Sequence, residues 1–203
     1  MRPIRTASLA LLLLSLLGPA LAASSAKATF AGGCYWCMEA TFEKLPGVTS
    51  VTSGYTGGSA RNPTSAEVNA GHTGHAEAVE VVFDPSKVTY EKLVEVYWEN
   101  IDPLAENGQF CDRGEQYRTA IFVHDDAQRR VAEESKKRVE EKLKAKVATQ
   151  IVAASAFYPA EESMQDYSKR NPLAYRRYVQ GCGREGLLEQ IWGTTPAEAK
   201  GKP

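Results

Sequence analysis

The stretch Thr29-Phe-Ala-Gly-Gly-Cys-Tyr-Trp-Cys-Met-Glu-Ala40 joins a short apolar segment to a helical pattern through a pair of glycines. The segment up to Ala31 is apolar enough for a buried strand, and Gly32-Gly33 gives the backbone the freedom for a tight turn. After the turn, apolar residues follow Cys34 on one helical face: Met38, Phe42 and Leu45. The stretch therefore predicts a strand, a turn and a helix that begins at or near Cys34.

This position makes Cys34 a candidate nucleophile. A thiol in the first turn of a helix faces unpaired backbone N–H groups and the positive end of the helix dipole, which favour the thiolate and lower the pKa. The alternative is a small buried cysteine without a chemical role. Cys34-Tyr-Trp-Cys37 also fits a thioredoxin-like redox pair. A zinc site is disfavoured because the remaining cysteines, Cys111 and Cys182, stand alone.

The composition is that of one globular domain with a separable N-terminal segment. The chain has 203 residues, of which 43% are hydrophobic and 24% charged, with a net charge of −1. Residues 1–22 carry two arginines, an apolar run, a Gly-Pro break and small residues at the end, which predicts a secretory signal peptide cleaved after Ala22. An uncleaved membrane anchor is disfavoured because the apolar run is short. Residues 23–203 then form a single exported domain, expected in the periplasm.

The strand predicted over His75-Ala-Glu-Ala-Val-Glu-Val-Val-Phe83 places one of its two glutamates on the core side. Period-two alternation puts Glu77 on the face that carries the apolar side chains, while Glu80 points the other way. A carboxyl at the rim of an apolar face has a raised pKa, which suits a general acid at neutral pH. The alternative is that Glu77 precedes the sheet proper and is solvated.

The rest of the chain completes an alternating pattern of strands and helices. It predicts strands over 48–55, 117–123 and 147–154, a helix from the Thr89 cap to Glu99, a helix from the Asp125 cap to Leu143, and irregular segments over 57–74 and 101–113. The order β-α-β-β-α-β-α-β predicts an α+β fold in which helices cover one side of a mixed sheet, close to the split βαβ (ferredoxin-like) plan. The aromatic-rich segment after Asn171 is weakly periodic and predicts a long irregular C-terminal tail.

Five motifs in this order resemble those of the A-type peptide methionine sulfoxide reductases, and the resemblance spans nearly all the chain after residue 22. They are Gly33-Cys-Tyr-Trp36, with Tyr in place of the usual Phe, Ser53-Gly-Tyr55, Gly74-His-Ala-Glu77, Asp112-Arg-Gly-Glu-Gln-Tyr-Arg118 and Phe157-Tyr-Pro-Ala-Glu-Glu162. The resemblance implies thiol-dependent reduction of methionine S-sulfoxide, peptide-bound or free, to methionine.

The resemblance also implies roles for single residues. Cys34 attacks the sulfur of the sulfoxide, and Glu77 protonates the oxygen. Tyr117 matches one of two family tyrosines whose hydroxyls bind that oxygen. The residues that bind the rest of the substrate match Tyr35 and Trp36, which enclose the methyl group, and Asp112, which orients the substrate backbone. The second family tyrosine is missing, because Ser65 follows Asn62-Pro-Thr64; Ser65 or Tyr55 takes its place, or no residue does.

The resemblance further implies that a sulfenic acid on Cys34 is closed to a disulfide by a second thiol and recycled by a thioredoxin-like donor. Cys182, in Gly181-Cys-Gly183, resembles the resolving cysteine that many relatives carry in a C-terminal tail. Cys37, about one helical turn from Cys34, is the alternative. Cys111 adjoins Asp112 and is a further thiol that could face the site.

No cofactor and no metal are implied, and we expect a monomer that repairs oxidised exported proteins. Nucleic acid and membrane surfaces are not expected partners, because the charge pattern shows no basic patch. Two other readings of the sequence stay open. One is a disulfide oxidoreductase that uses Cys34 and Cys37, and the other is a binding protein held together by structural disulfides. The histidines at 72, 75 and 124 are given no catalytic role.

Overall fold

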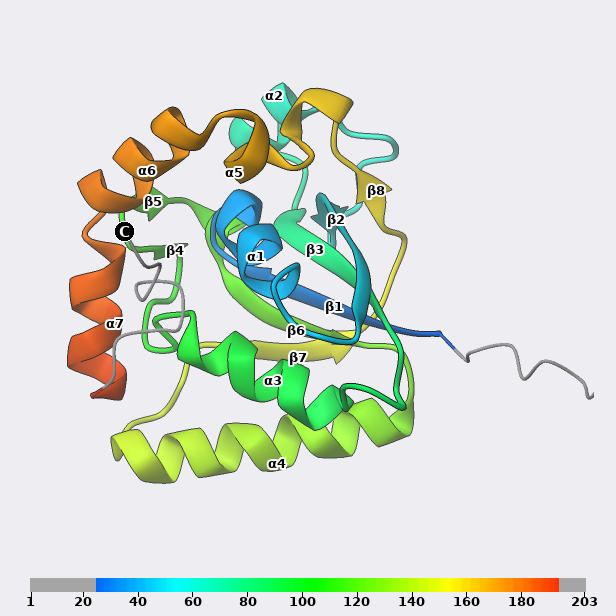
Figure 1. Ribbon diagram of the computed structural model, residues 1–203, viewed down its shortest axis with the longest axis vertical. Helices are drawn as coiled ribbons and strands as arrows, with labels where there is room; N and C mark the ends of the chain where they lie inside the picture. Colours follow the sequence, from blue (N-terminus) through cyan, green and yellow to red (C-terminus); the bar gives the residue numbers. More distant parts are fainter. Residues whose placement is uncertain (1–24, 194–203) are drawn as a thin grey trace, which may run out of the picture.

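The computed structural model describes residues 25–193, which form a six-stranded sheet flanked by helices (Figure 1). The strand order is β7-β6-β1-β3-β2-β8, and a separate ladder joins β4 to β5. The strands are β1 (Ala26–Gly32), β2 (Val48–Thr56), β3 (Ala76–Phe83), β4 (Gly108–Gln109), β5 (Asp112–Arg113), β6 (Thr119–Val123), β7 (Gln150–Ala153) and β8 (Tyr158–Pro159). The pairs within β6-β1-β3-β2 are antiparallel, and β7 is parallel to β6. This order confirms the α+β class and the split βαβ plan.

Helices α1, α3 and α4 form a layer on one face of the sheet (Figure 1). The helices are α1 (Tyr35–Phe42), α2 (Ser65–Asn69), α3 (Tyr90–Glu99), α4 (Asp126–Leu143), α5 (Tyr167–Arg170), α6 (Pro172–Gly181) and α7 (Arg184–Trp192), with 3-10 turns η1 (Glu115–Tyr117) and η2 (Glu162–Met164). Thr89 and Asp125 cap α3 and α4 as predicted, because each side chain accepts a hydrogen bond from a backbone N–H in the first turn. No helix within residues 25–193 is long and apolar enough to cross a membrane.

The two faces of the sheet carry side chains of different size. On the helical side, the ring of Phe30 stacks between those of Phe42 and Tyr97, with centroids 5.0 Å and 5.1 Å away. The Tyr97 hydroxyl donates a hydrogen bond of 2.8 Å to the carbonyl oxygen of Ala31, so this polar group is satisfied inside the core. The other face is built largely from alanines and Phe122, and the segment after β7 packs against it. The helical side therefore holds the main core.

Several predicted boundaries differ from the structure. Tyr117 lies in η1, and the strand begins at Thr119 instead. The segment 57–74 contains α2, and the segment 101–113 contains the β4-β5 ladder. The expected irregular tail carries α5, α6 and α7 with short connections; these helices are short, and no residue of α5 or α6 is fully buried, so their sequences show little apolar periodicity. The predicted signal peptide, residues 1–22, lies outside the described residues.

Candidate active site

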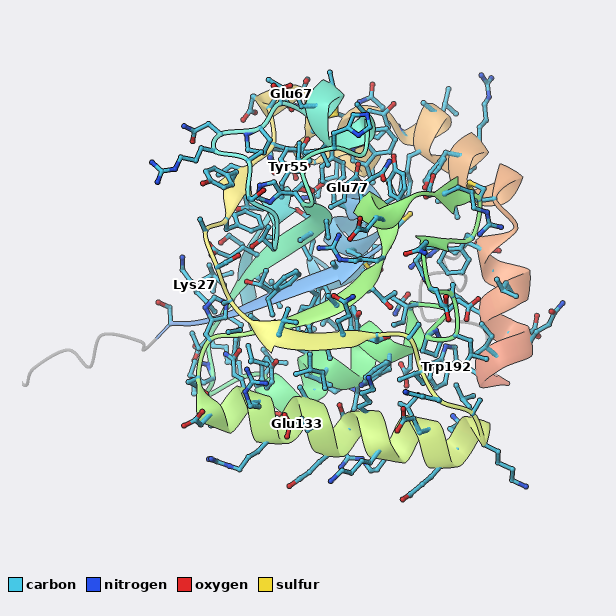
Figure 2. All side chains as sticks on the ribbon, turned by 180° about the vertical axis from the view of Figure 1, so that it is seen from behind. Lys27, Tyr55, Glu67, Glu77, Glu133 and Trp192 are labelled. Atoms are coloured by element: carbon cyan, nitrogen blue, oxygen red, sulfur yellow. A yellow bond between two sulfur atoms is a disulfide. The ribbon has the colours of Figure 1, made fainter. Side chains whose placement is uncertain are left out.

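A pocket of about 190 Å³ lies at the N-terminal end of α1. Six of the residues predicted from the sequence line it: Cys34, Tyr35, Trp36, Glu77, Asp112 and Tyr117. Ser65, Asn69, Met164 and Tyr178 complete the lining. The pocket therefore brings together side chains from the β1–α1 turn, β3, β5, η1 and the C-terminal helices. Figure 2 shows Glu77 and Tyr55 at the end of the sheet next to α2, which carries Glu67.

Cys34 occupies the N-cap of α1, directly after the turn that the glycines form. Gly33 has a φ of +82°, and a β-carbon there would stand 2.5 Å from Cβ of Gln109, so a side chain is excluded. Burial raises the pKa of Cys34 well above its ordinary value, and the neighbouring Cys37 and Glu77 raise it further. The predicted low pKa is therefore wrong for the resting site. The position at the helix terminus does not offset burial, and Cys34 rests as a thiol.

Glu77 lies on the core face of β3, as its alternation predicted, and its side chain is 4% exposed. One carboxylate oxygen accepts a hydrogen bond of 3.1 Å from the backbone N–H of Tyr35, in the first turn of α1. Burial raises the pKa of Glu77 to about 8, against the opposing effect of this hydrogen bond. The carboxyl is therefore a neutral acid at neutral pH, in the same pocket as the Cys34 thiol.

An aromatic wall forms one side of the pocket. Trp36 stacks on Tyr167 with the ring centroids 3.7 Å apart and the planes at 7°, and the edge of the Tyr178 ring meets it at 5.9 Å. The Trp36 indole N–H is buried without a hydrogen-bond partner among the described residues. Met164 lies on the same pocket lining. Such a surface suits an apolar group of modest size.

A chain of hydroxyls leads from the pocket to the carboxylate of Glu161. The Tyr35 and Tyr55 hydroxyls are 3.3 Å apart, and the Tyr55 hydroxyl is 2.5 Å from Oγ of Ser65. Ser65 in turn donates to Glu161, whose pKa is lowered by the hydrogen bonds from Ser65. Because the ionised Glu161 accepts only, each hydroxyl proton points toward it in the order Tyr35, Tyr55, Ser65. Ser65 lines the pocket and Tyr55 lies behind it, but neither has a free proton for a ligand in this arrangement.

Tyr117 and Asp112 also line the pocket. The Tyr117 hydroxyl donates to the side-chain oxygen of Asn69 at 3.3 Å, and burial raises the pKa of Tyr117. Burial also raises the pKa of Asp112, although Tyr178 donates a hydrogen bond to its carboxylate and lowers that pKa. The Tyr117 hydroxyl is thus held by one long hydrogen bond, to Asn69.

The cysteines are arranged differently from the expectation. Cys111 and Cys182 form a disulfide with a Cα–Cα distance of 4.9 Å, whereas Cys34 and Cys37 are buried thiols that are not disulfide-bonded. Cys182 therefore has no free thiol in this state, and the predicted resolving cysteine is engaged elsewhere. Cys37 hydrogen-bonds Cys34, which raises the pKa of Cys34. Cys37, the alternative resolving cysteine, is therefore the thiol next to the nucleophile Cys34.

Sequence reasoning missed four residues of the site. Asn69, Met164 and Tyr178 line the pocket, and Tyr167 supports Trp36 from behind. The aromatic-rich tail was the available signal for the two tyrosines, but its weak periodicity gave no direction to their side chains. Met164 and the two tyrosines reach the site because the C-terminal segment folds back over α1, which the sequence pattern does not predict.

A buried thiol beside a neutral carboxyl, with a second free thiol one turn away, defines a thiol-dependent oxidoreductase site. Comparisons with known proteins identify the family within this class. The sequence profile described as "Peptide methionine sulfoxide reductase" matches residues 26–196. The chain belongs to this family.

Individual relatives agree with the family match. The peptide methionine sulfoxide reductase MsrA of Bacillus licheniformis is 56% identical over 168 residues, which is 82% of this chain and 93% of that protein. Mxr1 from Saccharomyces cerevisiae in reduced form is similar in structure, with a TM-score of 0.70 and 30% identity over 73% of this chain and 87% of that chain. Mxr1 in complex with Trx2 matches with a TM-score of 0.51 and 25% identity over 70% of this chain and 84% of that chain.

We predict that Glu77 titrates near pH 8. Its carboxyl should stay neutral below that pH and ionise as the pH rises through it. Because the folded state holds this proton more tightly than the unfolded state, the free energy of unfolding should fall as the pH rises from 4.5 to about 8. The measurement is a carbon-13 NMR titration of protein with labelled glutamate carboxyls, together with unfolding curves across that range.

The Glu77→Gln variant assigns the resonance, because Glu39 is also buried and its pKa is raised to about 7. Glu67→Gln is the matched control, since Glu67 is exposed and its pKa is lowered by Thr64. A resonance that disappears in Glu77→Gln but titrates near 4.5 in the wild type would contradict the buried acid.

Proposed function

We propose that this chain reduces methionine S-sulfoxide, in peptides and as the free amino acid, to methionine. One observation carries the proposal: the Cys34 thiol and the neutral Glu77 carboxyl line the same small pocket. A nucleophilic sulfur can displace the oxygen of a sulfoxide only if that oxygen is protonated as the S–O bond weakens. A carboxyl that ionises near pH 8 holds the required proton at neutral pH.

The first half of the reaction transfers oxygen from the substrate to Cys34. The Cys34 sulfur attacks the sulfoxide sulfur while Glu77 protonates the sulfoxide oxygen, and the thiol proton returns to the Glu77 carboxylate. In the resulting adduct the hydroxyl moves from the substrate sulfur to the Cys34 sulfur, so that the S–O bond of the substrate and the new S–S bond both break. This step releases methionine and leaves a sulfenic acid on Cys34, so one sulfoxide and one thiol give one thioether and one sulfenic acid. Burial of both groups keeps the pocket neutral before the substrate arrives.

The walls of the pocket fit the substrate. Trp36, backed by Tyr167, offers a flat apolar face for the methyl group, together with Tyr35 in the same lining. Tyr117 can release Asn69 and donate to the sulfoxide oxygen, because its present hydrogen bond is long. Asp112 lies at the rim of the pocket, where it can accept a hydrogen bond from the substrate backbone.

The second half of the reaction closes a disulfide. We infer that Cys37 is the resolving thiol, because its side chain already contacts Cys34 and because Cys182 is bonded to Cys111. Attack of Cys37 on the sulfenic acid forms the Cys34–Cys37 disulfide and releases water. A thioredoxin-like dithiol then reduces this disulfide and leaves as a disulfide itself. The structural relative solved in complex with Trx2 supports such a donor, and we expect the enzyme to act as a monomer.

The activity predicts a defined response to two substitutions. With a peptide that contains methionine S-sulfoxide and with dithiothreitol as reductant, Cys34→Ser should abolish turnover because the nucleophile is absent. Glu77→Gln should lower the rate by about a hundredfold or more, the usual effect of removing a general acid. Glu80→Gln is the matched control on the same strand, since Glu80 faces away from the core and pairs with Lys27; it should stay within about twofold. Methionine formed per unit time is the readout.

The proposal fails if the folded, reduced wild type produces no methionine, or if Cys34→Ser keeps the wild-type rate. Exchange of protein disulfides without sulfoxide reduction would instead assign Cys34 and Cys37 to a disulfide oxidoreductase. Turnover of the R sulfoxide at the same rate as the S sulfoxide would contradict the proposed preference.

Turnover with thioredoxin distinguishes Cys37 from Cys182 as the resolving cysteine. With thioredoxin as donor, Cys37→Ser should lose turnover, because thioredoxin needs a disulfide, while Cys182→Ser should still turn over repeatedly, at a reduced rate because this variant also breaks the Cys111–Cys182 disulfide. Both variants should work with dithiothreitol, which reduces a sulfenic acid directly. Peptide mapping of wild type treated with one equivalent of sulfoxide should give a Cys34–Cys37 disulfide. A peptide that links Cys34 to Cys182 would restore the resolving role that the sequence suggested for Cys182.

We also propose that residues 1–22 direct export and that the enzyme repairs oxidised exported proteins in the periplasm. Expression of the full chain in a Gram-negative host should give a periplasmic protein whose N-terminus is Ala23, determined by mass spectrometry after fractionation. Leu13→Arg should block export, because it charges the apolar run. Full-length protein in the cytoplasm, equal for both chains, would contradict the proposal.

A further inference from the structure

Tyr178 reaches the active site from outside the motifs that carry the family resemblance. Its hydroxyl donates to the Asp112 carboxylate, and its ring meets the edge of Trp36 at 5.9 Å. Tyr178 and Cys34 line the same small pocket, and the Tyr178 hydroxyl acts to lower the pKa of Cys34 against the effect of burial. Tyr178 therefore lies beside the nucleophile and bonds to a second residue of the pocket.

The helix that carries Tyr178 is lightly packed. No residue of α6 is fully buried, and Leu173 is 67% exposed. Two adjacent ties fasten this helix to the pocket: the Tyr178–Asp112 hydrogen bond and the Cys182–Cys111 disulfide. Cys111 and Asp112 are neighbours in sequence. Tyr178, on α6, and Cys182, at the C-cap of α6, are four residues apart, about one helical turn. The disulfide therefore fixes the helical turn that aims Tyr178 at Cys34.

We propose that Tyr178 is a further catalytic residue, which donates its hydroxyl to the Cys34 sulfur as negative charge develops there, and that the Cys111–Cys182 disulfide holds it in place. The proposal rests on the function proposed above. Tyr178 supplies a hydroxyl next to the nucleophile, whereas the Tyr117 hydroxyl donates to the sulfoxide oxygen. It also gives the Cys111–Cys182 disulfide a role in the resting enzyme that differs from resolution of the sulfenic acid.

The hydrogen bonds can rearrange without a net transfer of protons. A tyrosine hydroxyl carries one proton, and in the resting site that proton points to Asp112. When the Cys34 proton leaves, the sulfur becomes the stronger acceptor and the Tyr178 hydroxyl turns toward it. Tyr178 stays protonated throughout, because burial raises its own pKa.

The other hydroxyls near the pocket do not duplicate this role. Those of Tyr35, Tyr55 and Ser65 are directed along the chain to Glu161. The Tyr117 hydroxyl donates to Asn69. Among the residues described here, Tyr178 is the tyrosine whose hydroxyl lowers the pKa of Cys34.

The test measures Cys34 directly, in a Cys37→Ser background that leaves Cys34 as the free thiol and the Cys111–Cys182 disulfide intact. The first readout is the rate of alkylation by iodoacetamide as a function of pH, which needs no sulfoxide. Tyr178→Phe should slow alkylation at neutral pH by about three- to tenfold. This range corresponds to the loss of one charge-assisted hydrogen bond. The loss is partly offset because a more basic thiolate is a stronger nucleophile. Tyr175→Phe, on the same helix but outside the pocket lining, is the matched control and should not change the profile.

The second readout is single-turnover reduction of methionine S-sulfoxide without added reductant. Tyr178→Phe should slow this reaction at saturating sulfoxide, not only raise the concentration needed to saturate it. Cys111→Ser/Cys182→Ser should shift both readouts in the same direction, and Tyr178→Phe should add less in that variant than in its parent, since the two changes act on one contact. Thermal melting checks that each variant is folded, and if the double serine variant is not, Tyr178→Phe alone decides the proposal.

The outcomes are separable. An alkylation profile that is unchanged in Tyr178→Phe overturns the proposal, and so does a single-turnover rate that is unchanged at saturation. If the parent protein alkylates normally but reduces no sulfoxide, the proposed function fails, and the alkylation profiles still show whether Tyr178 acts on Cys34. Full additivity of the two changes would contradict the role of the disulfide alone.

Discussion

The organisation of this molecule depends on the shared burial of Cys34 and Glu77. Burial disfavours the charged form of each group, so each has its pKa raised where it lies. The turn at Gly33 and the first turn of α1 bring the thiol to the carboxyl, and the backbone N–H of Tyr35 ties Glu77 to that helix. The core of aromatic rings under α1 keeps both groups away from water. The result is a neutral pair that develops charge only when a polar substrate enters.

Much of the fold follows from local pattern. The alternation along β3 placed Glu77 on the core face, because period two leaves one choice for each residue once the apolar face is known. The caps at Thr89 and Asp125 fixed where α3 and α4 begin, because their side chains satisfy backbone N–H groups that the helix cannot. The number and order of these elements then leave few topologies, and the split βαβ plan is the one that occurs.

What the sequence could not supply depends on contacts between distant segments. Cys111 and Cys182 are 71 residues apart, and nothing in either neighbourhood indicates that they meet. The helix terminus at Cys34 indicated a low pKa, but burial, with Cys37 and the distant Glu77, raises the pKa instead. Tyr178 lies in a weakly periodic tail, where the pattern gives no face to follow. Each of these features is a property of the folded surroundings and is invisible to local reasoning.

The chain of hydroxyls at Ser65 bears on how the site manages without the second family tyrosine. Because Glu161 is ionised and accepts from Ser65, Tyr55 is led to donate to Ser65 and Tyr35 to Tyr55. The protons of Tyr35 and Tyr55 are committed to the next hydroxyl and that of Ser65 to the carboxylate, so this wall offers oxygen atoms as acceptors rather than donors. The donors that remain near the reacting atoms come from Glu77, Tyr117 and Tyr178. With serine at position 65, hydrogen-bond donation therefore lies away from this wall, toward the segment that the disulfide holds.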